Sequence, residues 1–316
     1  MAASPTDPGA VSIIAPEVNA ALRRQSAVVA LESAVITHGL PYPTNIQLAR
    51  DMEAMVRKEG ATPATIAVIR GQVRVGITAE DVVLLAQSPS RQKSGPRDIP
   101  AAVLHKCDGG TTVGATMLVA ARAGISVFAT GGIGGVHRER AHDVSADLRM
   151  LAIMPMIVVC AGAKAILDLP ATLEYLETMC VPVIGYQTDE LPAFYSRESG
   201  LAVGTRLDSP SEIADFWRAH QAVGLGSAVL VTNPIPEASA IPRAEMEPLL
   251  GQASREAQER GIAGGQLTPF LLDRIGELSN GRTIAANLDL LLGNARLAAQ
   301  VARALVSHNI RKERMS

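Results

Sequence analysis

Short apolar runs alternate with longer amphipathic segments along the chain. The apolar runs are rich in Val, Ile and Ala, and Gly, Pro or polar residues bound them, which is typical of buried strands. These runs cover residues 28–31, 65–69, 73–77, 125–129, 156–163, 181–186 and 228–231. A glycine at position 71 separates the second run from the third, so we expect these two to form a hairpin.

Helical patterns occupy the segments between these runs. Leu48, Met52 and Val56 recur at helical spacing, which predicts a helix from Thr44 to Gly60. A hydroxyl residue followed three positions later by a carboxylate marks two further helix starts. Other helices are expected from 78, over 112–123 and 173–177, from 209, and over most of the chain after 242, where the last runs from 284 to 307.

This alternation of strands and helices predicts an α/β fold. We expect a three-layer α/β/α architecture with a mixed, largely parallel sheet and a helical C-terminal part. Hydrophobic residues make up 47% of the sequence and aromatic residues 3%, so the core is expected to be aliphatic, as in a buried parallel sheet. One domain is predicted over 17–310, with a flexible tail over 1–16 and a short basic tail over 311–316.

Charge and composition exclude several classes of protein. The net charge of −2 and the scarcity of aromatic residues argue against a nucleic-acid-binding surface. No apolar run approaches the roughly 20 residues that cross a bilayer, and the N-terminus lacks the pattern of a signal peptide. The three cysteines, Cys107, Cys160 and Cys180, form no C-x-x-C pair, so a reduced, cytoplasmic setting is expected. Cys160 lies within an apolar run, where a thiol is usually inert.

Lys164 ends one of the apolar runs and is the first candidate for chemistry. A lysine that a buried strand delivers to the edge of a sheet is poorly solvated, and this favours the neutral, nucleophilic amine. The alternative is a lysine whose ammonium group reaches the surface from a strand end.

Glu32 directly follows the apolar run at 28–31. Burial at the end of a strand raises the pKa of a carboxyl group and lets it hold a proton near neutral pH. A structural hydrogen bond to a turn is the alternative role for this side chain.

Asp143 and Asp147 are four residues apart, and on a helix they would share one face. Such a pair of like charges suits a hard cation such as Mg²⁺ or Mn²⁺, held largely through water. The alternative is that Asp143 caps a helix and Asp147 lies on the surface.

Two glycine-containing segments and one basic segment are weaker signals. Residues 109–112 (GGTT) open a helix, where exposed amides and hydroxyls would suit a phosphate, although capping by threonine explains them equally well. Residues 131–135 (GGIGG) lack the spacing of a dinucleotide fingerprint and predict either a close backbone approach to a ligand or another chain segment, or a tight bend. Residues 87–98, which include Lys93, are expected to form a mobile surface loop, and from composition a solvated linker is the better interpretation.

Taken together, a set of motifs resembles the family of pseudouridine-5′-phosphate glycosidases, also called indigoidine synthase A-like proteins. The motifs occur in the order of that family between about 28 and 306. They are 31–33 (LES), 37–43 (THGLPYP), 130–138 (TGGIGGVHR), 143–148 (DVSADL), 160–169 (CAGAKAILDL), 173–178 (LEYLET), 185–190 (GYQTDE), 233–236 (NPIP) and 268–272 (TPFLL).

This resemblance implies cleavage of the C–C glycosidic bond of pseudouridine 5′-phosphate to uracil and ribose 5-phosphate, or the reverse condensation. A C-glycoside has no leaving oxygen or nitrogen to protonate, so the paired carboxylates of ordinary glycosidases fit it poorly. An amine that attacks C1′ opens the sugar to an imine-linked adduct, and the base then leaves with a proton added at C5.

The matching motifs also imply roles for single residues. Lys164 corresponds to the covalent nucleophile, Glu32 to the proton donor, and Asp143 to the ligand of one Mn²⁺ ion per subunit, with waters completing its shell. The residues implied to contact substrate are Lys93, Thr112, Val113, His137, Ser145, Ala146, Asp147 and Asn287. The resemblance further implies a homotrimer.

The sequence departs from the pattern of the family at three places. Ala34 stands where Thr is common, Gly110 stands where Ala is usual, and the loop over 138–142 is short. We expect loss of one hydrogen bond at Ala34, a looser phosphate turn at Gly110 and a displaced metal ligand after the short loop, all affecting substrate range more than reaction class. Two other functions remain open: a Schiff-base lyase or aldolase on another sugar phosphate, and a non-catalytic sugar-phosphate-binding relative.

Overall fold

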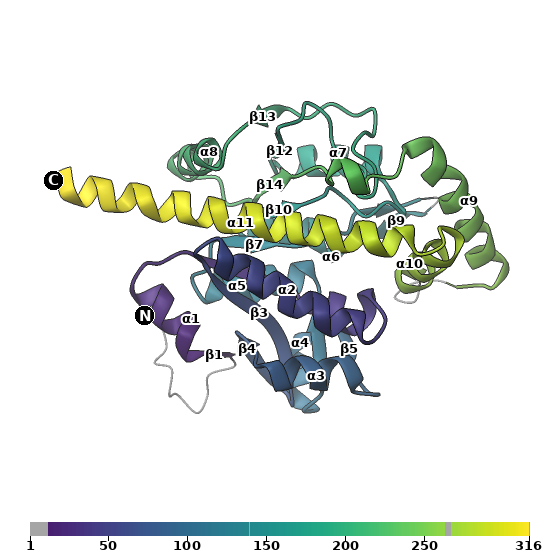
Figure 1. The fold of residues 1–316 in the computed structure, drawn as a ribbon, viewed down its shortest axis with the longest axis horizontal. Coiled ribbons are helices and arrows are strands. Elements are labelled where there is room, and N and C mark those ends of the chain that lie inside the picture. Colours follow the sequence, from purple (N-terminus) through teal and green to yellow (C-terminus); the bar gives the residue numbers. More distant parts are fainter. Residues whose placement is uncertain (1–11, 139, 263–266, 316) are drawn as a thin grey trace.

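The computed structural model describes residues 12–138, 140–262 and 267–315. Within these residues, eleven strands form one large sheet and three form a small antiparallel sheet (Figure 1). The large sheet contains β1 (Ser12–Ile14), β2 (Val28–Leu31), β3 (Thr62–Ile69), β4 (Gln72–Val75), β5 (Gln92–Ser94), β6 (Gly109–Thr111), β7 (Val127–Ala129), β10 (Ile157–Cys160), β12 (Val183–Tyr186), β13 (Thr205–Leu207) and β14 (Val229–Thr232). The small sheet contains β8 (Val136–His137), β9 (Arg140–Val144) and β11 (Leu167–Asp168).

The large sheet is mixed and largely parallel, as predicted. Its main path runs β1-β4-β3-β2-β7-β10-β14-β12-β13, and every neighbouring pair from β3 to β13 is parallel. The exceptions are β4 and β6, which pair antiparallel with β3, so the predicted hairpin is confirmed. The central strands consist mainly of Val, Ile, Leu and Ala and are buried along their whole length, because helices cover both faces.

Helices form the two outer layers. They are α1 (Pro16–Arg23), α2 (Thr44–Lys58), α3 (Ala79–Gln87), α4 (Ile99–Leu104), α5 (Val113–Arg122), α6 (Ala146–Ile153), α7 (Leu169–Thr178), α8 (Pro210–Val223), α9 (Arg243–Glu259), α10 (Leu267–Leu278) and α11 (Arg282–Met315), with a π-helix η1 (Val35–Gly39) and a 3₁₀ turn η2 (Glu237–Ser239). Figure 1 shows the long helix α11 beside α2 in front of the sheet, with α5 behind it. Helix α11 packs on α2, α8, β7 and β10, whereas α5 packs on α6, β2 and β3.

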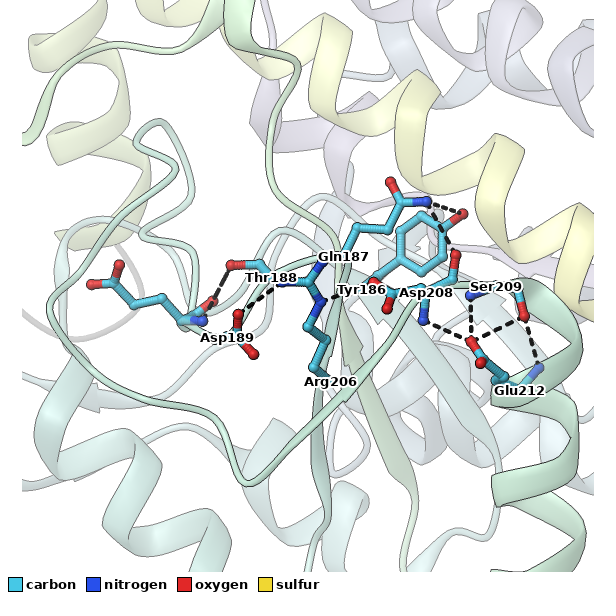
Figure 2. Close-up of polar contacts among 9 residues, drawn as sticks. Tyr186, Gln187, Thr188, Asp189, Arg206, Asp208, Ser209 and Glu212 are labelled. Atoms are coloured by element: carbon cyan, nitrogen blue, oxygen red, sulfur yellow. Dashed lines mark hydrogen bonds and ion pairs between the residues drawn. The ribbon is translucent and has the colours of Figure 1, made fainter.

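The predicted helix start at 209 is confirmed by a complete capping box. Ser209 accepts a hydrogen bond from the amide of Glu212, and Glu212 accepts one from the amide of Ser209 at 2.8 Å (Figure 2). In the same region Arg206 of β13 pairs with Asp189 at 2.8 Å and with Asp208 at 2.9 Å. These exposed contacts lie at the edge of the sheet farthest from β1. The helix start at 78 has the same reciprocal arrangement.

Two predicted tail boundaries need correction. Residues 12–14 of the tail predicted over 1–16 form β1, which pairs parallel with β4, and α1 begins at Pro16; residues 1–11 lie outside the described part. At the other end, α11 continues to Met315, so the predicted basic tail over 311–316 extends a helix up to that residue. No helix within the described residues is long and apolar enough to cross a membrane.

The segment over 87–98 is not simply a solvated linker. It contains β5, which pairs parallel with β6, and Ser94 at the end of β5 is fully buried. The short strand lies beside η1, and Arg91, just before it, donates a hydrogen bond to the carbonyl of Thr37 at 2.9 Å. This pairing fixes the backbone of Lys93, which the sequence pattern placed on a mobile loop.

Candidate active site

The candidate active site lies where the carboxyl ends of β2, β7 and β10 meet. The chain leaves β2 through α2 to reach β3 on one side, whereas it leaves β7 through α6 to reach β10 on the other side. Ligands of open α/β sheets bind at such reversals of strand order. Glu32 follows β2, Thr130 follows β7, and Lys164 lies four residues beyond the end of β10.

Backbone pairing continues past the ends of β7 and β10. The amide of Ala161 donates to the carbonyl of Gly131 at 2.9 Å, and the amide of Ile133 donates to Gly162 at 3.1 Å. The amide of Lys164 then donates to the carbonyl of Ile133 at 3.1 Å. The glycine-rich segment after β7 is therefore a backbone partner of the lysine loop, and it fixes the point from which the Lys164 side chain projects.

Two hollows are lined in part by Lys164. The wider one is a cavity of about 770 Å³, and the narrower is a recess of about 60 Å³. Lys93, Lys164 and Thr268 line both. The cavity is also lined by Thr112, Gly134, His137, Asp143, Ser145, Ala146 and Asp147, and the recess by Glu32, Ala34, His38, Gly132, Phe194, Leu272, Asn287 and Leu291. Lys164 thus lies between the polar cavity and the more apolar recess.

Glu32 is buried at the recess, with 8% of its surface exposed. One carboxylate oxygen accepts a hydrogen bond from the hydroxyl of Thr130. Burial raises the pKa of Glu32, and the positive charge of Lys164 and the Thr130 hydrogen bond oppose this effect only in part. The predicted environment of Glu32 is therefore present, and its carboxyl is suited to hold a proton.

Lys93 approaches the same place from β5. Burial lowers its pKa, as does the neighbouring charge of Lys164, whereas Asp147 and Glu32 act in the opposite direction. Lys164 and Asp147 therefore lie close enough to Glu32 and Lys93 for their charges to act on the pKa values of these two buried groups.

Asp147 is a buried residue, which excludes the predicted surface position. Only 5% of it is exposed, and its two oxygens accept hydrogen bonds from the amides of Gly114 at 2.8 Å and Gly134 at 2.9 Å. A Cβ on Gly134 would lie 2.7 Å from the Asp147 carboxylate, so glycine permits this close approach. Asp147 thereby joins the start of α5 to the glycine-rich segment after β7 at the wall of the cavity.

Asp143 does not share a helix face with Asp147, and this prediction was wrong. Asp143 lies in β9, which pairs with β8, and Ser145 is the residue that caps α6 through the amide of Asp147 at 3.2 Å. Both carboxylates nevertheless face the same cavity. Asp143 forms no hydrogen bond or ion pair with any residue in the described part of the chain, so its oxygens are available to a ligand.

The glycines at 109 and 110 do not form the predicted phosphate turn. They belong to β6, where their backbone pairs with β3 and β5, and the amide of Thr111 is bound to the hydroxyl of Ser33 at 3.0 Å. Thr112 is the N-cap of α5, as the alternative interpretation had it, and it lines the cavity. Val113 follows it but is buried, with 1% exposed.

Gly110 tightens the site instead of loosening it. A Cβ at this position would collide with the hydroxyl of Thr37 and lie 2.7 Å from the carbonyl of Ser33. We therefore expect Gly110→Ala to destabilise the protein by about 1–3 kcal/mol and to displace η1 from the recess. Urea denaturation checks this, with Gly204→Ala as the control because nothing lies within 4 Å of a Cβ there. An equal stability of the two variants would contradict the expectation.

Several residues that shape the recess were not singled out from the sequence. Phe194 lies against Gly132, where a Cβ would approach its ring to 2.6 Å, and its own backbone has a positive φ of 63°. His38 is bound to Thr37 at 2.7 Å, and its pKa is lowered, chiefly by burial. Asn287, which was predicted, reaches the recess from α11. Phe194 belongs to no recognised motif, and His38 lies in the motif over 37–43 without an assigned role, so the fold is needed to place both at the recess.

Cys160 is excluded as a nucleophile. It is fully buried within β10, and this burial raises the pKa of its thiol to about 12. The thiol is therefore protonated at neutral pH and inert, as its position in an apolar run predicted.

A model of the family described as "Indigoidine synthase A like protein" matches residues 17–304. A protein of Paracoccus denitrificans named pseudouridine-5′-phosphate glycosidase is 54% identical over 93% of this chain and 98% of its own length. A protein of the same name from Caldanaerobacter subterraneus is 50% identical over 90% of this chain and 94% of its own.

Two solved structures have the same fold. An indigoidine synthase A-like protein of Thermotoga maritima is 37% identical, with a TM-score of 0.84 over 90% of this chain and 94% of its own. The prealnumycin C-glycosynthase AlnA, solved with ribulose 5-phosphate, is 38% identical, with a TM-score of 0.88 over 96% of this chain and all of its own.

Proposed function

The chain belongs to the indigoidine synthase A like family, and we propose that it is a pseudouridine-5′-phosphate glycosidase. It cleaves the C–C glycosidic bond of pseudouridine 5′-phosphate to uracil and ribose 5-phosphate, and it can run the reverse condensation. The observation that carries this proposal is that an amine, Lys164, and a buried carboxyl that can hold a proton, Glu32, both line the recess. The relatives' names and the C-glycosidic chemistry of AlnA support it.

An acid that protonates the leaving group is not sufficient to cleave a C-glycoside, and a nucleophile is needed as well. The amine of Lys164 attacks C1′, the C1′–O4′ bond breaks, and the ring oxygen takes a proton. The nitrogen lone pair then forms the C1′=N bond as the C1′–C5 bond breaks, and Glu32 gives its proton to C5 of the departing uracil. Water hydrolyses the imine, which releases ribose 5-phosphate and restores the amine.

The two hollows suit the two halves of the substrate. The cavity has the volume for a ribose phosphate, and Lys93 with the hydroxyls of Thr112 and Ser145 supplies a cation and donors there. The backbone of Val113, first in α5, places a helix N-terminus next to Thr112. Part of the base reaches the recess, where Glu32 and Asn287 lie among apolar side chains.

Asp143 fits the role of a lone carboxylate ligand for Mn²⁺. It lines the open cavity and has no partner among the described residues, and no set of three or more His, Cys, Asp and Glu side chains that could hold a metal occurs in the described ranges. A hard cation held by one carboxylate and several waters is consistent with both observations. When bound, the ion would supply positive charge near the phosphate end of the substrate.

We therefore expect Asp143→Asn to weaken Mn²⁺ binding at least about tenfold, because the amide loses the ligand charge. Electron paramagnetic resonance of free Mn²⁺ titrated with protein measures this without any turnover. Asp215→Asn is the matched control, since Asp215 pairs with Arg218 on α8, remote from the cavity. Equal affinity of the two variants would exclude Asp143 as the ligand.

Two further properties are proposed, each on its own basis. We infer a homotrimer from the resemblance to the family. We infer a reducing, cytoplasmic setting from the free cysteines, Cys107, Cys160 and Cys180, none of which forms a disulfide.

Release of uracil tests the function directly. Purified protein with pseudouridine 5′-phosphate and Mn²⁺ is expected to yield uracil and ribose 5-phosphate in equal amounts, measured by chromatography. A Schiff-base lyase on another sugar phosphate would release no uracil, and neither would a binding relative. Binding of ribose 5-phosphate without any uracil release would favour the last of these.

A further inference from the structure

A chain of buried hydrogen bonds leads from α11 to the carboxyl of Glu32. Asn294 is fully buried in α11, and its amide nitrogen donates to the carbonyl of Thr130 at 2.8 Å and to that of Gly131 at 3.4 Å. Its oxygen accepts from the side chain of Asn233 at 3.0 Å. The hydroxyl of Thr130, also fully buried, donates to Glu32.

These hydrogen bonds join the ends of four neighbouring strands, β2, β7, β10 and β14. Thr130 follows β7 and its amide donates to Val159 of β10 at 3.0 Å, while Asn233 follows β14 and its amide donates to Cys160 at 2.7 Å. A buried amide in an aliphatic helix costs free energy unless its partners are present. Asn294 has three such bonds, so its geometry is strongly determined.

We propose that Asn294 and Thr130 are positioning residues that fix which oxygen of Glu32 delivers the proton. Thr130 has no hydrogen-bond acceptor other than Glu32 Oε1 for its hydroxyl within the described residues. Oε1 is thereby committed to accepting, which leaves Oε2 to carry the proton toward the recess. Asn294 holds the backbone of Thr130 and so keeps this donor in place. The inference rests on the proposed role of Glu32 as the proton donor.

Three other groups face Glu32 and enter its titration: Lys164, Lys93 and Asp147. None of them is bonded to Asn294 or Thr130. Thr130 lowers the pKa of Glu32 because its hydrogen bond favours the carboxylate. Loss of that donor therefore raises the pKa further, and the alkaline limb of the activity profile moves to higher pH.

The test compares Thr130→Val, Asn294→Ala, their double variant, and the control Gln300→Ala. Gln300 lies on the same helix but bonds to Glu59, away from the site. We expect each test variant to lower kcat about tenfold, less than the roughly 10²–10⁴-fold that a general acid supplies, with KM changed less than about twofold. The alkaline limb should move upward, and borohydride trapping of the sugar on Lys164 should persist, because the amine is untouched.

The double variant separates positioning from general damage. Substitutions within one hydrogen-bond network should not have additive effects on kcat. The double variant is therefore expected to lose no more activity than the worse single variant. An unchanged kcat and alkaline limb in Thr130→Val would overturn the proposal, as would losses that multiply. If Asn294→Ala does not fold, Asn233→Ala takes its place, since it removes only the donor to Asn294.

A readout without turnover separates this inference from the proposed function. A carbon-13 NMR titration of the Glu32 carboxyl should show a higher pKa in Thr130→Val than in wild type, even if no uracil is released. An unchanged pKa with normal uracil release would refute the positioning role alone. No uracil from the wild type, together with a raised pKa in the variant, would refute the function but keep the role of Thr130 in orienting the carboxyl.

Discussion

Lys164→Ala is expected to lower kcat at least about 10⁴-fold, because removal of a covalent nucleophile leaves no alternative route for opening the sugar. Lys164→Arg should be equally inactive, since a guanidinium keeps the charge but offers no neutral amine. Substrate affinity should fall much less, because the cavity wall with Lys93, Thr112 and Ser145 remains. Single-turnover release of uracil and equilibrium binding of ribose 5-phosphate measure the two effects.

The matched control for this prediction is Lys58→Ala. Lys58 is an exposed amine in the last turn of α2, outside both hollows. It should retain wild-type activity and the same melting temperature. Residual uracil release by Lys164→Ala within about tenfold of the wild type would assign the nucleophile to another group, and Lys93 would then be the first candidate because its pKa is lowered.

Glu32→Gln is expected to lower kcat about 10²–10⁴-fold, the usual contribution of a general acid. The amide keeps the shape of the side chain and can still accept the hydrogen bond from Thr130, so the loss reports the missing proton. In the wild type, activity should persist into the pH range where an ordinary carboxyl is ionised and should fall as pH rises through the raised pKa of Glu32. The variant should lack this limb.

Glu53→Gln is the matched control for Glu32→Gln. Glu53 is another partly buried carboxyl whose pKa burial raises, and it accepts a hydrogen bond from Thr65 at 2.6 Å, but it lies outside the hollows. Its variant should keep full activity. Equal activity of the two variants would remove Glu32 from the reaction.

The same burial has a consequence for stability. The pKa of Glu32 is higher in the folded than in the unfolded protein. The contribution of this side chain to the free energy of unfolding is therefore fully present below the unfolded pKa of about 4.3, and it is lost as pH rises through the folded pKa. Glu32→Gln cannot ionise there. Its melting temperature should therefore decline less steeply than that of the wild type between about pH 5 and the folded pKa.

The edge of the sheet at which the site lies could be predicted from the chain itself. Apolar runs that end in Glu32 and Lys164 define strand ends, and parallel strands bring their carboxyl ends to one edge. Capping boxes at Thr78 and Ser209 are local in sequence, so they too appear where expected. These features depend on contacts within a few residues and on strand direction.

The remaining features depend on strand pairing and on contacts between distant segments. Asp143 looked helical because it precedes Asp147 by one turn, but β8 recruits it into a hairpin. The sequence pattern predicted a turn at Gly110, but this residue lies in β6, which pairs with β3 on one side and β5 on the other. Asn294 lies 164 residues from Thr130, and no local spacing predicts that the two are bonded. Tertiary context decides such positions.

The central claim is that Lys164 forms a covalent adduct with the sugar of a C-nucleotide. The most direct measurement is the intact mass of the protein after incubation with pseudouridine 5′-phosphate and borohydride, followed by peptide mapping. We predict one reduced ribose-phosphate adduct per chain, located on Lys164 and absent from Lys164→Ala. An unmodified chain that nevertheless releases uracil, or an adduct on another lysine, would contradict the mechanism.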